Sequence, residues 1–218
     1  MKYQHVVPGE FVRRENRFIA KVLVDGAEEA VHVKNTGRLK ELLVPGAEVY
    51  LERAQNPERK TKYDLIAVRK ANGILFNIDS QACNKVAMEW LQKQDYDVIK
   101  PEYKFGGSRV DFYMEKAGEK FLLEIKGCTL EVDGVGYFPD APTERGVKHL
   151  RELAGAAAEG YRCAVGFVIQ MDGVSEVRPN VETHPEFGAA LEEAKAAGVE
   201  VLMLRCHVEP DELMILCS

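Results

Sequence analysis

The stretch that decides the fold of the second half of the chain is Ser108-Arg-Val-Asp111-Phe112, followed after a turn by Phe121-Leu-Leu-Glu124-Ile-Lys126. Both segments set charged side chains among apolar ones, as half-buried β-strands do. Between them, Ala117-Gly118 fits the two-residue loop of a β-hairpin. With that loop Lys116 pairs with Glu119, and the register continues outward from there. The sequence therefore predicts a hairpin that sets an acidic residue of one segment opposite an acidic residue of the other.

That register places Asp111 directly opposite Glu124, and Lys126, two positions further on, projects from the same face as Glu124. Facing carboxylates repel each other, which a sheet tolerates when a divalent cation lies between them. Mg²⁺ prefers one or two carboxylates together with water and substrate phosphates. An ammonium beside it can orient an attacking water or stabilise charge on a phosphate. We therefore expect Asp111, Glu124 and Lys126 to form a nuclease-type catalytic site that binds Mg²⁺, with Mn²⁺ as a possible substitute.

Two simpler interpretations compete with this one. A strand that ends in Glu-x-Lys is often a solvated face, and an Asp–Lys ion pair would explain Asp111 and Lys126 without a metal. The apolar neighbours argue against a solvated face, because charges among them are rarely left without a partner. An ion pair leaves the carboxylate of Glu124 unexplained.

Sites of this kind often recruit a further acid. Glu102, which follows Pro101, is the predicted additional metal ligand, with a surface role equally open. Glu89 is a second candidate, but it lies off the apolar stripe of its helix and a surface position suits it better. Asn84 shares a helical strip with apolar residues and needs a hydrogen-bond partner, either a group of the site or a structural one.

The remainder of residues 81–218 predicts an α/β domain with a mixed central sheet. A nearly continuous apolar run at 163–169 is typical of a strand buried on both faces. Gly160 and Gly198 follow two helical segments, where glycine commonly ends a helix. We expect helices at 82–95, 143–159 and 186–197, strands at 96–103, 109–114, 121–125, 163–169, 199–208 and 213–217, and a loop at 131–142.

Residues 1–80 predict a separate barrel domain. The expected strands lie at 11–24, 30–33, 48–53, 63–69 and 74–78, with a hairpin turn at Asp25-Gly26 and one short helix at 36–43. Five short strands and one helix are the elements of an OB-like five-stranded Greek-key barrel, although an SH3-like barrel fits the same pattern.

Charge is distributed unevenly along the chain, whose net charge is −6. Residues 1–80 carry 14 Lys and Arg against 11 Asp and Glu, whereas residues 81–218 carry 15 against 24. A mildly basic front suits a protein that touches nucleic acid with one part. We expect Arg13, Arg14, Arg17 and Arg38 of the barrel to bind DNA, with His32 beside them and Phe18 in the core.

The helix at 143–159 presents Arg145, Lys148, His149 and Glu152 on one face. Arg145 and Lys148 are predicted to contact DNA phosphates, whereas a solvated face with a Lys148–Glu152 pair is the alternative. His149 lacks partners at the spacing of metal ligands. Asp140 and Thr143 are expected to cap the start of this helix.

Composition places the chain among soluble globular proteins, with 46% apolar and 29% charged residues. No apolar run is long enough to span a membrane, and Met1-Lys2-Tyr3-Gln4-His5 lacks the apolar core of a signal peptide. Five scattered cysteines without a C-x-x-C pair indicate reduced thiols. We expect a cytoplasmic protein that binds no membrane. The oligomeric state stays open, and an edge strand at 213–217 would allow a homodimer.

An Asp, a hairpin and then Glu-x-Lys before a helix resembles the PD-(D/E)xK nuclease superfamily, except that Val110 stands where the name has Pro. A longer set of motifs resembles the sugar fermentation stimulation protein family across nearly the whole chain. The motifs are Arg13-Arg14-x-Asn16-Arg17-Phe18, His32-Val-x-Asn35-Thr36-Gly37-Arg38-Leu39, Ser108-Arg-Val-Asp111, Glu124-Ile-Lys126-Gly, Phe138-Pro-Asp140-Ala and Thr143-Glu-Arg-Gly-x-Lys148-His149-Leu-x-Glu-Leu153. The resemblance implies an OB-like barrel, a restriction-endonuclease-like α/β domain, DNA binding and a regulatory role in sugar (maltose) metabolism.

Three functions from different classes follow. The first is a metal-dependent nuclease, and the second is a DNA-binding regulator of sugar metabolism that keeps the nuclease fold without catalysis. The third, a carbohydrate-binding barrel, has few aromatic platforms to support it. The sequence leaves open whether the DNA is single-stranded or duplex.

Overall fold

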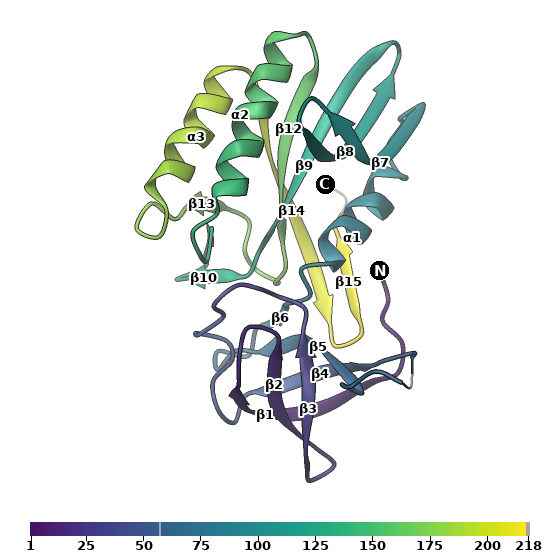
Figure 1. Cartoon of the computed structure of the whole chain (residues 1–218), viewed down its shortest axis with the longest axis vertical. Coiled ribbons are helices and arrows are strands. Elements are labelled where there is room, and N and C mark those ends of the chain that lie inside the picture. Colours follow the sequence, from purple (N-terminus) through teal and green to yellow (C-terminus); the bar gives the residue numbers. More distant parts are fainter. Residues whose placement is uncertain (57, 217–218) are drawn as a thin grey trace.

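Five strands close into a barrel in the first part of the chain. In this computed structural model, which describes residues 1–56 and 58–216, the strand order is β3-β2-β1-β4-β5, and a parallel contact between β3 and β5 closes the ring (Figure 1). The short strand β6 pairs with β5 outside the ring. The predicted OB-like five-stranded barrel is confirmed. Its strands are β1 (Val6–Arg14), β2 (Ile19–Val24), β3 (Ala27–Val33), β4 (Glu48–Arg53) and β5 (Tyr63–Arg69), with β6 at Leu75–Asn77.

Two details of the barrel differ from the prediction. The stretch 11–24 contains the end of one strand and the whole of the next, and residues 36–43 form a single turn in place of a helix. Leu39 has a φ of 49°, and its backbone N–H donates to the carboxylate of Asp140. The N–H of Gly37 donates to the side chain of Asn35. The positive φ of Leu39 takes the backbone out of the helical conformation, so the segment keeps one turn, in which the N–H of Leu43 donates to the carbonyl of Leu39.

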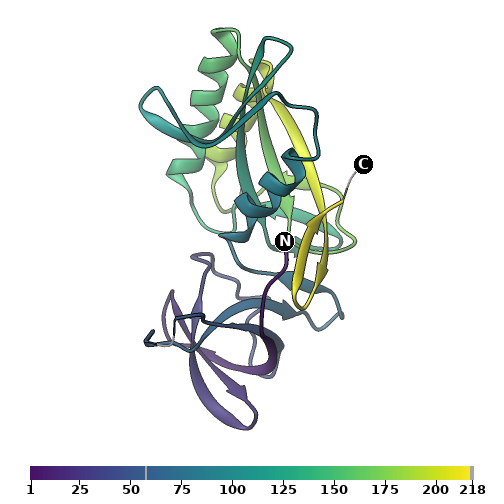
Figure 2. The same ribbon diagram turned by 90° about the vertical axis from the view of Figure 1, so that its right-hand side faces the viewer.

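A mixed six-stranded sheet forms the centre of the second part, in the order β15-β14-β12-β9-β8-β7. The predicted buried strand, β12, runs parallel to both of its neighbours. Figures 1 and 2 show α2 and α3 together on one face of this sheet and α1 on the other. The elements are α1 (Ala82–Leu91), β7 (Val98–Phe105), β8 (Ser108–Lys116), β9 (Glu119–Cys128), α2 (Glu144–Ala158), β12 (Arg162–Ile169), α3 (Pro185–Ala196), β14 (Glu200–Glu209) and β15 (Glu212–Ile215).

The segment 131–142 was predicted as a loop, and it contains two short strands. β10 (Leu130–Val132) and β11 (Val135–Phe138) pair with each other, and β11 also pairs with β13 (Val177–Pro179). Strands of three or four residues among Gly and Pro carry too short a pattern to be recognised in the sequence. Cys83, Cys128, Cys163 and Cys206 are buried free thiols, and Cys217 lies outside the described residues. Within the described ranges, no helix is long and apolar enough to cross a membrane.

Polar side chains join the barrel to the α/β part. Gln170 is 1% exposed and donates to the side chain of Asn77 and to the carbonyl of Asp79, both of which follow the barrel. Lys70 of the barrel pairs with buried Glu131 at 2.5 Å. These contacts fix how the two parts meet, since a buried polar group left without its partner costs about 1–3 kcal/mol.

Asp64 lies at the centre of a buried ion-pair cluster in the barrel, and it predicts an acid-sensitive contribution to stability. Burial would raise its pKa, but hydrogen bonds from Arg59 at 2.7 Å and Lys34 at 3.0 Å outweigh burial and lower the pKa from 3.8 to about 2. A lowered pKa stabilises the fold above pH 4, and this contribution is lost as the pH falls towards 2.

We expect Asp64→Asn to lower the free energy of unfolding by about 2 kcal/mol at pH 7, and by clearly less at pH 3, in urea titrations at both pH values. Asp95→Asn, at a carboxylate that is 99% exposed, serves as the control and should change little. An equal loss at both pH values for Asp64→Asn would mean that the carboxylate charge is not what stabilises the barrel.

Candidate active site on β8, β9 and α2

The predicted hairpin register is confirmed from its loop outward. Lys116 pairs with Glu119, and the ladder continues to Phe112 opposite Leu123. One residue further on, the backbone pairing stops, and the side chain of Asp111 contacts β9 instead. Its Oδ2 accepts the backbone N–H of Ile125 at 2.7 Å. Asp111 therefore lies where β8 separates from β9, beside Glu124.

Asn84 of α1 donates to Oδ1 of Asp111 at 2.8 Å. Of the two roles that the sequence left open for Asn84, the structure shows that it orients a group of the site. Burial, and then the negative charge of Glu124, raise the pKa of Asp111, while the bonds from Ile125 and Asn84 oppose the shift. Charge repulsion between these two carboxylates therefore exists, as the facing register predicts.

Glu124 is almost fully buried, and its Oε1 accepts from two cations or potential cations. Lys126 Nζ lies 2.5 Å away, and His149 Nδ1 of α2 is hydrogen-bonded to the same oxygen. Burial alone would raise the pKa of Glu124, but the bonds from His149 and Lys126 outweigh burial and lower it. Glu124 is thus held ionised next to Lys126, which is what the site requires.

His149 is the residue that sequence reasoning missed. Its Nε2 accepts from Nε of Arg145 at 3.3 Å, so in the neutral ring Nδ1 carries the proton and donates it to Glu124. Nothing in the spacing of the sequence links His149 to Glu124. The sequence predicts His149 on the charged face of this helix, but the structure buries its ring, and a buried polar ring needs a partner.

The charged residues around the site differ in their partners and in their exposure. Lys148 pairs with Glu152 at 3.6 Å, as the alternative interpretation of this helix face expected, and Glu152 accepts from Ser108 Oγ at 2.8 Å. Arg145 remains exposed apart from its bond to His149. Thr143 caps α2 as predicted, since its Oγ1 accepts the N–H of Gly146. Asp140 does not cap this helix; its carboxylate binds the backbone of the barrel.

The two candidate acids outside the hairpin have different surroundings. Glu102 lines the same hollow as Asp111 and Asn84, although its side chain is 62% exposed and lies 3.8 Å from Arg109. Glu89 lines that hollow too, and its carboxylate binds the amino group of Met1 at 2.6 Å. Glu102 therefore stays the predicted additional ligand, and Glu89 has the surface role that its helical position indicated.

The donor set fits a hard cation. Asp111 and Glu124 supply carboxylate oxygens, and among the described residues every hydrogen bond to Glu124 reaches Oε1, which leaves Oε2 available. A bound cation would also relieve the repulsion that raises the pKa of Asp111. Oxygen ligands without Cys or His are those that Mg²⁺ and Ca²⁺ prefer.

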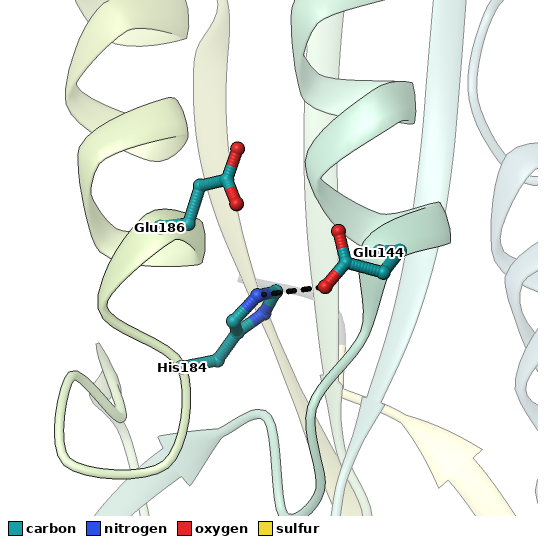
Figure 3. Close-up of side chains that lie close together, drawn as sticks. All are labelled: Glu144, His184 and Glu186. Atoms are coloured by element: carbon teal, nitrogen blue, oxygen red, sulfur yellow. Dashed lines mark ion pairs between the residues drawn. The ribbon is translucent and has the colours of Figure 1, made fainter.

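A second group of ligand-type side chains lies between the starts of α2 and α3 (Figure 3). Ligand atoms of Glu144, His184 and Glu186 lie within 4.8 Å of one another. The backbone N–H of Thr143 donates to Nδ1 of His184, so the proton of the neutral ring is on Nε2, which faces Glu144 at 3.4 Å. A metal at Nε2 would require the opposite tautomer and break the bond to Thr143. We interpret this group as a link between the two helices.

The basic residues predicted to bind DNA in the barrel divide into two kinds. Arg14 is half-buried, and its guanidinium donates to five backbone carbonyls, so its donors are used inside the protein, unlike the prediction. Those carbonyls belong to Asn16, Arg17, Asn35, Gly37 and Arg38.

Arg13, the neighbour of Arg14, pairs with Glu28 at 3.0 Å at the surface. Arg17 and Arg38 are exposed, and Arg14 holds their two loops together. The prediction that Phe18 lies in the core is wrong, because its side chain is 52% exposed on the same loop as Arg17. His32 binds Asp64 within the ion-pair cluster.

Comparison with known proteins places this arrangement in a family. Residues 12–78 match the description "SfsA N-terminal OB domain", and residues 81–212 match "Sugar fermentation stimulation protein RE domain". A sugar fermentation stimulation protein homolog of Desulfitobacterium hafniense is 54% identical over 216 residues, which cover 98% of this chain and 94% of the relative. A homolog of Clostridium beijerinckii is 52% identical over 219 residues, with 99% and 96% covered.

A solved structure, that of Pyrococcus furiosus SfsA in complex with Ca²⁺, is similar over 99% of this chain and 95% of its own, with a TM-score of 0.87 and 30% identity. The predicted architecture, an OB-like barrel followed by a restriction-endonuclease-like α/β domain, is therefore shown by both fold and relatives. This chain belongs to the sugar fermentation stimulation protein family.

Proposed function

We propose that this protein binds DNA and cleaves phosphodiester bonds at a Mg²⁺-dependent site formed by Asp111, Glu124 and Lys126. In this proposal residues 1–80 are the DNA-binding barrel and residues 81–218 the nuclease-like domain. The single observation that carries it is the pair of carboxylates at the fork of β8 and β9, half-buried Asp111 and buried Glu124, with Lys126 2.5 Å from Glu124. The Ca²⁺ complex of the Pyrococcus furiosus relative supports a divalent cation in this family.

Each residue has a distinct part in this chemistry. When bound, Mg²⁺ supplies Lewis-acid polarisation of the phosphate and lowers the pKa of a water ligand. Asp111 and Glu124 offer the oxygens that hold the ion, and Glu102 is proposed as a further ligand. Asn84 and the N–H of Ile125 fix the orientation of Asp111. Lys126 lies where its ammonium can orient the attacking water or stabilise charge on the phosphate, while His149 keeps Glu124 in place.

The DNA path that we propose runs from the barrel to the start of α2. Arg17 and Arg38 supply phosphate contacts and Phe18 a ring on which an unpaired base can stack. Arg145 and Lys148 continue the basic groups on the α/β side. Arg13 and Arg14 are left out of this path, because one is paired with Glu28 and the other is bound to backbone carbonyls.

We expect Arg17→Ala and Arg38→Ala each to weaken DNA binding about three- to tenfold and to lower the slope of affinity against salt by about one. Phe18→Ala should weaken single-strand binding by a similar factor without changing that slope, since stacking releases no counterions. Fluorescence anisotropy at several salt concentrations measures both quantities. Lys195→Ala, an exposed lysine of α3 paired with Glu192, should leave them unchanged. Equal losses in all four variants would contradict the path.

One observation favours the second function, a DNA-binding regulator of sugar metabolism that retains the fold without catalysis. Oε1 of Glu124 is bound to both Lys126 and His149, which stabilises the site in the absence of metal. A site satisfied in this way can persist as a structural element. The regulator and the nuclease share the DNA-binding surface and differ only in cleavage.

The experiment that separates them is cleavage of labelled single-stranded, duplex and flapped DNA with Mg²⁺ or Mn²⁺. Metal-dependent products from purified wild type support the nuclease and show which DNA structure it prefers. DNA retained in a gel shift without any product on the three substrates supports the regulator. Neither retention nor product would contradict both.

A further inference from the structure

A hollow of about 280 Å³ lies where the barrel meets the α/β part, and the nuclease chemistry does not use it. Its walls come from the barrel loop at Thr36, from Gly127 and Thr129 after β9, from Gln170 after β12, and from the segment before α2. β9 and β12 run parallel and both end here. In α/β folds, ligands bind in the crevice outside the carboxyl ends of parallel strands.

The walls present hydrogen-bonding groups without positive charge. Thr36, Thr129, Tyr137 and Asp140 are among the residues that line the hollow, and no Lys or Arg is among the described residues that line it. A phosphate would therefore be repelled by Asp140. A neutral ligand with hydrogen-bonding edges and a flat face fits better, because Tyr137 also supplies a ring.

Thr129 offers an unused hydrogen-bonding group to the hollow. The residue is 7% exposed, and across residues 1–56 and 58–216 its hydroxyl forms no side-chain hydrogen bond. The hydroxyl still reaches solvent, because among the described side chains Glu41 Oε1 alone is a fully buried oxygen or nitrogen without a partner. Gln170, which also lines the hollow, has no such free group, because its amide is hydrogen-bonded to Asn77, Asp79 and Cys83. The hydroxyl of Thr129 is therefore available to a ligand that replaces water in the hollow.

The position of the hollow indicates which ligand it receives. Gly127 follows Lys126 directly, and on the other side Asp140 binds the N–H of Leu39 in the loop that carries Arg38. A strand that contacts both Arg38 and Lys126 has the hollow between its two contacts, since Gly37 and Gly127, which adjoin these residues, line it. Its phosphates would stay on the basic surface outside, and only a base with its sugar could enter.

We propose that this hollow receives one unstacked nucleoside of the bound DNA strand, an inference that rests on the proposed function. Taking a base out of a paired stack costs free energy, and the cost is smallest for an unpaired base. The hollow thereby makes the protein selective for DNA with an unpaired nucleoside near the cleavage site. It also sets which phosphodiester lies beside Lys126.

The test compares binding, without metal, of a fully paired duplex and the same duplex with one bulged nucleoside. Wild type should bind the bulged duplex about tenfold more tightly. Thr129→Val, which removes the hydroxyl at nearly constant volume, and Thr36→Trp, which closes the exposed mouth, should bring this ratio close to one while affinity for paired duplex stays the same. Thr61→Val, outside the hollow, is the matched control.

An unchanged ratio in both variants, or no preference in wild type, overturns the inference and leaves the nuclease proposal standing. If neither duplex binds, the DNA-binding proposal fails. Titration with free deoxyadenosine and deoxycytidine, monitored by NMR, then decides whether the hollow is a nucleoside site. Saturable shifts that Thr36→Trp abolishes would keep it as a nucleoside site. No shift up to about 10 mM, far weaker than pockets of this kind bind, would reject it.

Discussion

Glu124→Ala and Lys126→Ala are each expected to lower metal-dependent DNA cleavage about 100- to 1,000-fold, the range found when a group that stabilises the transition state is removed. In the proposed site Glu124 is a cation ligand and Lys126 is the ammonium beside it, with Nζ 2.5 Å from Oε1 of Glu124. Because the two residues act as one unit, the double variant should lose little more than either single variant. Product formation on labelled DNA under single-turnover conditions measures these rates.

Loss of folding is the competing explanation, and the hairpin itself offers the controls. Glu119 and Lys116 lie at the tip of the same hairpin and are exposed. Glu119→Ala and Lys116→Ala should therefore keep full activity. Glu124→Gln preserves shape and burial but removes the charge that Lys126 and His149 bind, so it should lower the melting temperature, as Asp64→Asn does, yet remain folded at the assay temperature while cleavage is lost. Full cleavage by Glu124→Gln would rule out Glu124 as a metal ligand.

Measurements of DNA binding distinguish residues of the proposed cleavage site from residues of the proposed DNA path. Neither Glu124→Gln nor Lys126→Ala touches Arg17, Phe18 or Arg38, so affinity without metal should change by less than about threefold, the lower end of the effect expected for one phosphate contact. A large loss of affinity in Lys126→Ala alone would instead make Lys126 a DNA-binding residue. That outcome would favour the regulator.

The hairpin of the site could be predicted because its information is local. Ala117-Gly118 defines the loop, the loop defines the register, and the register brings Asp111 to Glu124. The buried strand β12 was equally clear from its apolar run. Elements of this kind depend on the chain within a few residues, which is the range over which sequence patterns are informative.

What could not be predicted depends on contacts between distant segments. His149 reaches Glu124 across 25 positions, and Asp140 binds the N–H of Leu39 across 101 positions. The second contact also holds the backbone at Leu39, whose φ of 49° does not fit the helix predicted at 36–43. Phe18 was expected in the core because it is apolar, but its loop is held outward by Arg14.

Arg14→Ala should destabilise the protein by about 2–4 kcal/mol, because five backbone carbonyls lose their donor at once and those that stay buried are left unsatisfied. Burial lowers the pKa of the Arg14 guanidinium, yet it stays charged at neutral pH. Urea unfolding measures the loss. Arg13→Ala is the matched control: it removes the same side chain one position earlier, where the surface pair with Glu28 is screened by solvent and its loss should change stability little.

The same pair of variants tests how the DNA surface is built. Arg14 joins the loop of Arg17 and Phe18 to the loop of Gly37 and Arg38, so its removal should weaken DNA binding although it touches no phosphate in the proposed path. Arg14→Lys keeps the charge but cannot reach five carbonyls from one ammonium. If Arg14 acts through structure, Arg14→Lys loses affinity almost as Arg14→Ala does, with no change in the salt slope. If Arg14→Lys binds DNA like wild type and Arg14→Ala lowers the slope by about one, Arg14 contacts phosphate directly.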